Sequence, residues 1–236
     1  MTYRRADRIF AKTTETKESL PQGVRQKCYV QCEIGIDRDQ HAGIRDSANN
    51  FLFVGRFLYW KGGDLAIRAF CKVANTNPTI RLTMVGKGPE TENWKNLARE
   101  SGAESQIRFV DWVSQSELST IYHEHDVFLF PSLHDSSGNV VLEAMSKGMP
   151  VVCFDAGGPA ELVDNSSGVV VECEEGSAQD AISSLAAGIQ GLVSNPQAVR
   201  SLSLGALQRI EQYSWSAVVD GVYDKIYPLQ SNSQSA

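Results

Sequence analysis

The chain has 236 residues, enough for one large domain or one and a half ordinary ones. Hydrophobic residues make up 42% of it, which is normal for a folded core, and the formal net charge is −6. This acidic, mixed charge argues against a nucleic-acid partner and against a strongly basic membrane-docking surface. No apolar run approaches the roughly 20 residues that cross a bilayer. The N-terminus has no apolar stretch behind its early positive charges, so it is not a secretory signal, and we expect a cytoplasmic protein.

The cysteines and histidines lack the spacing of a metal site. The five cysteines are an odd number with no paired metal-ligand pattern, so buried free thiols are expected. His123 and His125 do not have the i, i+4 spacing of a zinc-binding helix. We therefore expect these side chains to be structural or at the surface. The cysteines are Cys28, Cys32, Cys71, Cys153 and Cys173.

The first fifty residues differ from the rest of the chain. Residues 1–37 hold a helix-like piece and one predicted strand, 28–31. Residues 38–50 are polar and typical of a linker.

From residue 51 onward, short apolar runs predicted as strands alternate with segments of helical spacing. Apolar strands separated by helices indicate a parallel sheet that is buried on both faces. We therefore predict an α/β fold, a doubly wound, Rossmann-like parallel sheet that binds ligands at the carboxyl ends of its strands. The expected strands are 51–55, 80–86, 107–110, 127–130, 150–154 and 168–171, and the expected helices are 63–74, 89–100, 115–123, 138–147 and 159–163.

Residues 178–227 are predicted to be helical, with breaks at 195–196 and 213–214. Ser214 is a good cap for a last helix. The main domain is therefore expected to span 51–228, followed by a disordered polar tail, 229–236.

The first candidate site lies just after the first strand of the predicted sheet. Arg56 follows that strand, and Lys61 with two glycines opens the next helix. Two cations beside a helix N-terminus suit a diphosphate, and glycine lets a large anion approach the backbone. The alternative is an ordinary surface Arg and Lys in a strand–helix loop.

The second candidate site is the loop 131–139, which runs from a buried strand into a helix. Such a loop offers backbone amides to an anion. Glu143 follows among apolar neighbours, where a carboxylate needs a partner. The hydroxyls of a ribose would supply one. The alternatives are a nearby Lys or Arg, or simple exposure to solvent.

Three further features are weaker. The Gly-rich turn 155–161 also lies at the binding edge, but many α/β turns resemble it. Trp112 is a candidate floor of a base pocket, or equally a core residue. Gly86-Lys87-Gly88 lacks the third glycine of a dinucleotide fingerprint.

Together these segments resemble the donor-binding domain of retaining glycosyltransferases of family 4, which have the GT-B fold. The resemblance covers about residues 50–227, and its five blocks occur in family order. Residues 1–37 resemble the end of the family's N-terminal acceptor domain and the crossover into the second domain. The matching stretches are VGRFLYWKGGDLAIRAF, LTMVGKGPE, IRFVDWVSQSELSTIY, HDVFLFPSLHDSSGNVVLEAMSKGMPVV and GGPAELVDNSSGVVV.

The resemblance implies roles for matching positions. Arg56 and Lys61 would bind the donor diphosphate and stabilise its developing charge, and Glu143 would bind the ribose. Asp135 takes the position of a carboxylate that faces the transferred sugar, with a reach shorter by one methylene. The catalytic set is then Arg56, Lys61 and Asp135, and the remaining substrate-binding residues are Trp112, Val113, Ser137, Gly138, Asn139, Val140 and Glu143.

The resemblance also implies an activity. A hexosyl group would pass from a nucleoside-diphosphate sugar, as co-substrate, to an acceptor with retention, as in polysaccharide biosynthesis. Neither a metal nor another cofactor would be required. The acceptor (a glycan, lipid or small molecule) would bind the family's first domain, of which only the last piece fits before residue 38. We therefore expect weak nucleotide binding, no transfer by this chain alone and a homodimer through the exposed interdomain face. The full-length enzyme would be cytoplasmic, or peripheral at the inner face of the membrane.

Other functions stay open. The chain is alternatively a non-catalytic nucleotide-sugar-binding subunit of a split transferase, or a GT-B sugar-nucleotide epimerase. An NAD-dependent dehydrogenase is disfavoured by the incomplete glycine fingerprint.

Overall fold

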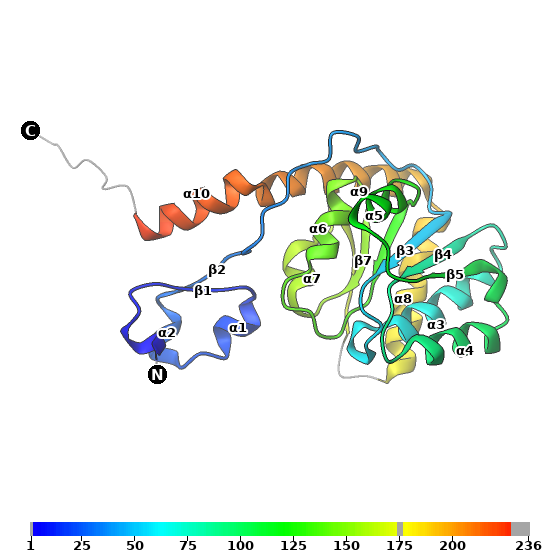
Figure 1. Ribbon diagram of the computed structural model, residues 1–236, viewed down its shortest axis with the longest axis horizontal. Coiled ribbons are helices and arrows are strands. Elements are labelled where there is room, and N and C mark those ends of the chain that lie inside the picture. The colour runs from blue at the N-terminus through cyan, green and yellow to red at the C-terminus, as the bar shows by residue number, and fades with distance from the viewer. Residues whose placement is uncertain (1, 174–176, 228–236) are drawn as a thin grey trace, which may run out of the picture.

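The computed structural model describes residues 2–173 and 177–227, and six parallel strands dominate it (Figure 1). Each strand lies within two residues of its expected position at either end. This confirms the predicted α/β, doubly wound sheet. The strands are β3 (Asn50–Val54), β4 (Arg81–Val85), β5 (Ile107–Val110), β6 (Val127–Phe130), β7 (Val151–Phe154) and β8 (Gly168–Val171).

The strand order is β5-β4-β3-β6-β7-β8. The chain moves from β3 outward to β5, then returns to the other side of β3 and moves outward again to β8. Strands β3 and β6 are thus neighbours, with Phe51 opposite Val127 and Leu52 opposite Phe128. The connections leave these two strands toward opposite halves of the sheet, which opens a crevice at their carboxyl ends.

Helices cover both faces of the sheet (Figure 1). Helices α3, α4 and α8 lie on one side, and α5, α6 and α9 lie on the other. Ser114 caps α5 as expected, and Glu117 completes a capping box. The helices are α3 (Gly63–Ala74), α4 (Thr91–Glu100), α5 (Gln115–His123), α6 (Asn139–Ser146), α7 (Gly157–Leu162), α8 (Ala178–Val193), α9 (Pro196–Arg209) and α10 (Trp215–Ile226).

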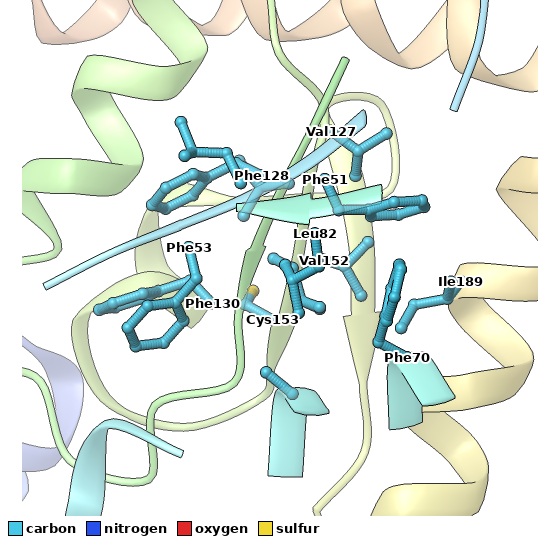
Figure 2. Packing of buried hydrophobic residues seen from close by; sticks show 14 of the residues in the cluster. Phe51, Phe53, Phe70, Leu82, Val127, Phe128, Phe130, Val152, Cys153 and Ile189 are labelled. Atoms are coloured by element: carbon cyan, nitrogen blue, oxygen red, sulfur yellow. The ribbon is translucent and has the colours of Figure 1, made fainter. Parts of the chain in front are cut away.

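The core lies between these layers and explains why the strands are almost wholly apolar. Phe53 and Phe130 of neighbouring strands pack with ring centroids 5.8 Å apart. Figure 2 shows Phe70 of α3 and Ile189 of α8 side by side beneath the sheet. Full burial of each such side chain contributes about 1.5–3 kcal/mol.

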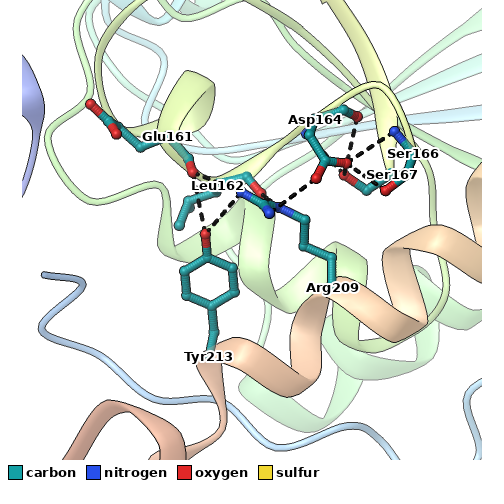
Figure 3. Close-up of polar contacts among 7 residues, drawn as sticks. All are labelled: Glu161, Leu162, Asp164, Ser166, Ser167, Arg209 and Tyr213. Carbon is teal, nitrogen blue, oxygen red and sulfur yellow. Dashed lines mark hydrogen bonds and ion pairs between the residues drawn. The ribbon is translucent and has the colours of Figure 1, made fainter. Parts of the chain in front are cut away.

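Arg209 of α9 fastens the C-terminal helices to the sheet (Figure 3). Its Nε donates to the carbonyl of Leu162 at 2.7 Å, and its Nη1 lies 3.0 Å from Oδ2 of Asp164. The other oxygen of Asp164 accepts from the backbone amide of Ser166. The segment after α7 is thereby fixed against α9.

The N-terminal segment contains a strand that the sequence did not indicate. Strand β1 (Ile9–Ala11) pairs in parallel with β2 (Cys28–Val30), and the short helices α1 (Thr14–Glu18) and α2 (Gln22–Arg25) lie between them. Only three residues long, β1 is too short to show an alternating pattern. A single 3-10 turn, Thr2–Arg5, precedes it.

The expected linker 38–50 lacks helix and strand up to Asn50 but lies on the main domain. Asp39 forms an ion pair with Lys147 after α6, and Oδ2 of Asp126 accepts from the backbone amides of Asn49 and Asn50 at 2.9 Å. The expected tail, 229–236, lies outside the described residues. In the part of the chain that is described, no helix combines the length and apolar character needed to cross a membrane.

Candidate functional site

A cavity of about 410 Å³ lies in the crevice between β3 and β6. One wall follows β3 and the other follows β6, so the cavity occupies the point where the strand order reverses. It brings together the predicted residues Arg56, Lys61, Asp135, Ser137, Asn139 and Val140, and its other lining residues are Val54, Gly55, Trp60, Phe130, His134 and Ser136.

The β3 wall depends on a close approach between two loops. Gly62 has φ of 69°, and a Cβ there would lie 1.9 Å from the carbonyl oxygen of Pro131. Only glycine fits this left-handed position against the loop after β6. The contact sets Lys61 beside Asp135.

Arg56 is the exposed cation of the cavity. Its guanidinium meets no hydrogen-bond or ion-pair partner among residues 2–173 and 177–227. A guanidinium presents five donors in a planar fork that suits phosphate oxygens. Arg56 is therefore available to an anionic ligand.

Lys61 is already paired. Its ammonium forms an ion pair with Oδ2 of Asp135 and lies 5.5 Å from the ring centroid of Phe130. The side chain of Lys61 is 19% exposed and that of Asp135 is 11% exposed. The sequence presented these residues as separate contacts to phosphate and sugar, whereas the structure joins them.

Asp135 also organises its own loop. Oδ1 accepts from the backbone amides of Ser137 at 3.0 Å and Gly138 at 2.9 Å. Burial raises the pKa of Asp135, but the bonds from Lys61 and the two amides outweigh it and hold the pKa below its ordinary value. The carboxylate is therefore charged at neutral pH.

The N-terminus of α6 opens toward this cavity. Gly138, the residue before the helix, has φ of 61°, and its backbone amide donates to the carboxylate of Asp135. The next two amides, of Asn139 and Val140, have no acceptor within the described part of the chain. Free first-turn amides and the helix dipole favour an anion at this end.

Glu143 lies one turn further along α6. It does not line the cavity itself, but it is four residues after Asn139 and three after Val140, so it lies on the same face of the helix as these two lining residues. Its Oε2 accepts from the phenol of Tyr122, on α5, at 2.9 Å. This partner is neither the Lys or Arg nor the bulk solvent that the sequence offered as alternatives to a ribose. Burial raises the pKa of Glu143, and the bond from Tyr122 offsets this only in part.

Trp112 and Val113 do not line the cavity. Both follow β5, which lies two strands away from β3. Trp112 is 74% exposed, so it is not a core residue, and Val113 is half-buried against the core.

The sequence reasoning missed several cavity residues. Trp60 lines the cavity, and only its adjacency to Lys61 signalled it. His134 and Ser136 also line the cavity; they belong to the candidate loop 131–139, but neither was assigned an individual role from the sequence. The Gly-rich turn also reaches the site, because the amide of Gly158 donates to the carbonyl of Asp135 at 2.6 Å.

A second cavity of about 550 Å³ adjoins the first and shares His134, Asp135 and Ser136 with it. It extends to Glu161, whose Oε1 accepts from the amide of Thr14 at 2.8 Å. No group of three or more His, Cys, Asp or Glu side chains in the described ranges is placed to hold a metal ion.

Residues 37–204 match the protein family described as "Glycosyl transferases group 1". A D-inositol 3-phosphate glycosyltransferase of Corynebacterium aurimucosum is 35% identical over 172 residues, which cover 70% of this chain and 39% of that protein. Glycogen synthase of Mycobacterium tuberculosis is 31% identical over 175 residues, which cover 74% and 41%, respectively. The chain thus spans about two-fifths of the length of these curated relatives.

Solved structures share the fold. Anabaena HepE in complex with UDP superposes with a TM-score of 0.80 at 19% identity, over 95% of this chain and 64% of that one. The pneumococcal O-GlcNAc transferase GtfA, in complex with UDP and GlcNAc, gives 0.75 at 18% identity, over 94% and 45%. Because the family match covers well over half of the sequence, the chain belongs to the group 1 glycosyl transferases.

Proposed function

We propose that the cavity between β3 and β6 binds the diphosphate of a nucleoside-diphosphate sugar. The observation that carries this proposal is the convergence of the Arg56 guanidinium with the amides of Asn139 and Val140. An exposed cation and a helix N-terminus on opposite walls complement a pyrophosphate, which carries charge at both ends.

Glu143 is the proposed ribose ligand. It lies one helical turn beyond the amides that face the phosphate, a rise of about 6 Å along the helix. Its Oε1 accepts no hydrogen bond from any described residue. A ribose hydroxyl would give this half-buried oxygen a donor.

The transferred sugar belongs, in this proposal, in the second cavity, beside Asp135. That cavity shares three residues with the phosphate site, so a sugar bonded to the diphosphate would reach it directly. The glycosyl–phosphate bond would break through an oxocarbenium-like transition state, and the fixed positive charge would stabilise the departing diphosphate. We propose net retention and no required metal.

The activity of the whole protein is likewise a proposal. The relatives are named D-inositol 3-phosphate glycosyltransferase and glycogen synthase, and the chain covers only 39% and 41% of their length, respectively. We propose sugar transfer to an acceptor that meets the donor at the Asp135 side of the cavity.

Calorimetric titration tests the proposal. UDP, GDP, ADP and their sugar conjugates are titrated into the chain, with NAD as the comparison ligand. We expect one nucleoside diphosphate to bind at least tenfold more tightly than NAD, a difference of about 1.4 kcal/mol. Binding of NAD with no binding of any nucleoside diphosphate would refute the proposal in favour of a dehydrogenase.

A non-catalytic binding subunit would give the same titration. Because this chain alone is expected not to transfer sugar, turnover is measured with the acceptor domain supplied. A transferase then transfers the sugar of its donor, whereas a binding subunit releases the donor intact. A sugar-nucleotide epimerase would instead convert the donor with no acceptor present.

A further inference from the structure

Tyr122 is the one tyrosine with a fully buried side chain among the residues that the structure describes, and it contacts Glu143, the proposed ribose ligand. Its side chain is 1% exposed and lies in the last turn of α5, where its ring packs 6.0 Å from the ring of Phe128. Burial raises the pKa of the phenol well above its ordinary value. The hydroxyl is therefore a permanent donor at neutral pH.

The hydroxyl meets α6 at two points. It lies 2.9 Å from Oε2 of Glu143 and 3.4 Å from the carbonyl oxygen of Val140. The first contact is the short one, and a bond to a charged acceptor is the stronger kind. Tyr122 is the one hydrogen-bond donor to this carboxylate among the residues that the structure describes.

We propose that Tyr122 is a positioning residue for the ribose-binding carboxylate. Its O–H holds Oε2 of Glu143, which leaves Oε1 to accept from a ribose hydroxyl. Tyr122 thereby sets the preference of the site for a ribonucleotide over a deoxyribonucleotide. This inference rests on the proposed function, because it assumes that Glu143 binds ribose.

The physical reason is the cost of an unpartnered carboxylate. Without the phenol, a half-buried carboxylate rotates toward water or takes up a proton. Either change removes a fixed acceptor from the ribose. The diphosphate contacts, which come from Arg56 and the amides of α6, do not depend on the phenol.

The test compares UDP, GDP and ADP with their 2′-deoxy counterparts by calorimetry, using wild type and Tyr122→Phe. Wild type is expected to prefer the tightest-binding ribonucleotide over its deoxy form by about tenfold, the effect of one hydrogen bond to a charged group. Tyr122→Phe is expected to reduce this ratio to about threefold or less, with affinity for the deoxynucleotide nearly unchanged. If Tyr122→Phe only disturbed the packing of the protein, it would weaken the binding of the ribonucleotide and of the deoxynucleotide equally.

Tyr213→Phe is the matched control. Its hydroxyl is also part-buried, but it lies 3.2 Å from the carbonyl oxygen of Glu161, away from Glu143. It should leave the ratio as in wild type. The double variant Tyr122→Phe/Glu143→Gln completes a double-mutant cycle. Its preference for the ribonucleotide over the deoxynucleotide should be no lower than that of Glu143→Gln alone.

The test distinguishes a failure of the positioning role of Tyr122 from a failure of the proposed function. If wild type discriminates and Tyr122→Phe discriminates equally, the positioning role is wrong and the proposed function stands. If wild type binds nucleoside diphosphates without discrimination, Glu143 is not the ribose ligand and the inference falls with it. If wild type binds none of the six nucleotides, the proposed function itself fails and the inference with it.

Discussion

The two cations of the cavity are in different electrostatic states. Arg56 is exposed and unpaired within the described residues, whereas Lys61 is held by the partly buried Asp135. The sequence could place both beside a predicted helix but could not tell them apart, since their difference arises from a contact across 74 residues.

Alanine substitutions of Arg56 and Lys61 should have different effects on protein stability. We expect Arg56→Ala to weaken diphosphate binding by about 1.5–3 kcal/mol, the range for hydrogen bonds to a charged group. Its melting temperature should barely change, since the side chain lies on the surface. Lys61→Ala should weaken binding and also destabilise the fold by about 1–3 kcal/mol, because it leaves Asp135 without its cation. Calorimetry and thermal unfolding measure the two effects, and unchanged affinity in both variants would refute the phosphate site.

Glu143→Gln should stabilise the protein at neutral pH while weakening nucleotide binding. Because burial raises the folded pKa of Glu143 above its ordinary value of 4.5, its charge opposes folding at neutral pH. The stability gained by glutamine is fully present above the raised pKa. It declines as the pH falls below that value, and it vanishes below 4.5. Thermal unfolding from pH 8 to pH 4 measures this, and a difference that grows toward acid pH would contradict it.

Glu117→Gln is the control for Glu143→Gln, because the pKa of Glu117 is shifted in the opposite direction and the variant should therefore lose stability. Its pKa is lowered by the hydrogen bonds of the Ser114 capping box. Wild-type stability from this group is therefore present above 4.5 and is lost as the pH falls through the lowered pKa. The glutamine variant should be less stable than wild type at neutral pH.

At the scale of elements, the main sheet and its helices were predictable because their local signals agree with the fold. Helix α3, strand β5 and helix α5 have the expected bounds, since caps and apolar runs mark them. Strand β1 was not predictable, because three residues between charged flanks carry no pattern. The contact of Tyr122 with Glu143 was not predictable either, because it joins two helices through the tertiary packing of a buried ring.

Gly62→Ala tests the loop contact that forms the site. Gly62 and Gly102 have nearly equal positive φ, 69° and 71°, but only at Gly62 would a Cβ strike another loop. We expect each alanine to cost about 1–2 kcal/mol for the left-handed backbone. Gly62→Ala should cost more than Gly102→Ala and should also weaken nucleotide binding. Denaturant unfolding and calorimetry compare them, and equal losses would show that the contact with Pro131 does not matter.

At the scale of the whole molecule, α10 exposes a row of large apolar side chains. Trp215, Val219 and Tyr223 are 52%, 44% and 59% exposed and are spaced four residues apart, so they lie along one helix face. Helix α10 extends beyond the main domain toward the N-terminal segment (Figure 1). The homodimer expected from the sequence stays a prediction. Light scattering across a concentration series checks it, and Val219→Lys should shift the protein to monomer if this face forms the contact.

The fold class followed from the sequence alone, whereas the position of the cavity required the strand order. That order puts the loops after β3 and β6 side by side, although more than 70 residues separate them. A single sequence shows that two loops lie at the same edge of a sheet. It does not show which of them are neighbours.

The central claim is that a nucleoside diphosphate binds where β3 and β6 diverge. A crystal structure of the chain with its tightest-binding nucleoside diphosphate tests this most directly. We predict phosphate oxygens within hydrogen-bond distance of the Arg56 guanidinium and the amides of Asn139 and Val140, with the ribose hydroxyls on Glu143. A nucleotide found elsewhere, such as in the cavity lined by Asn50, Arg81 and His125, would contradict the account.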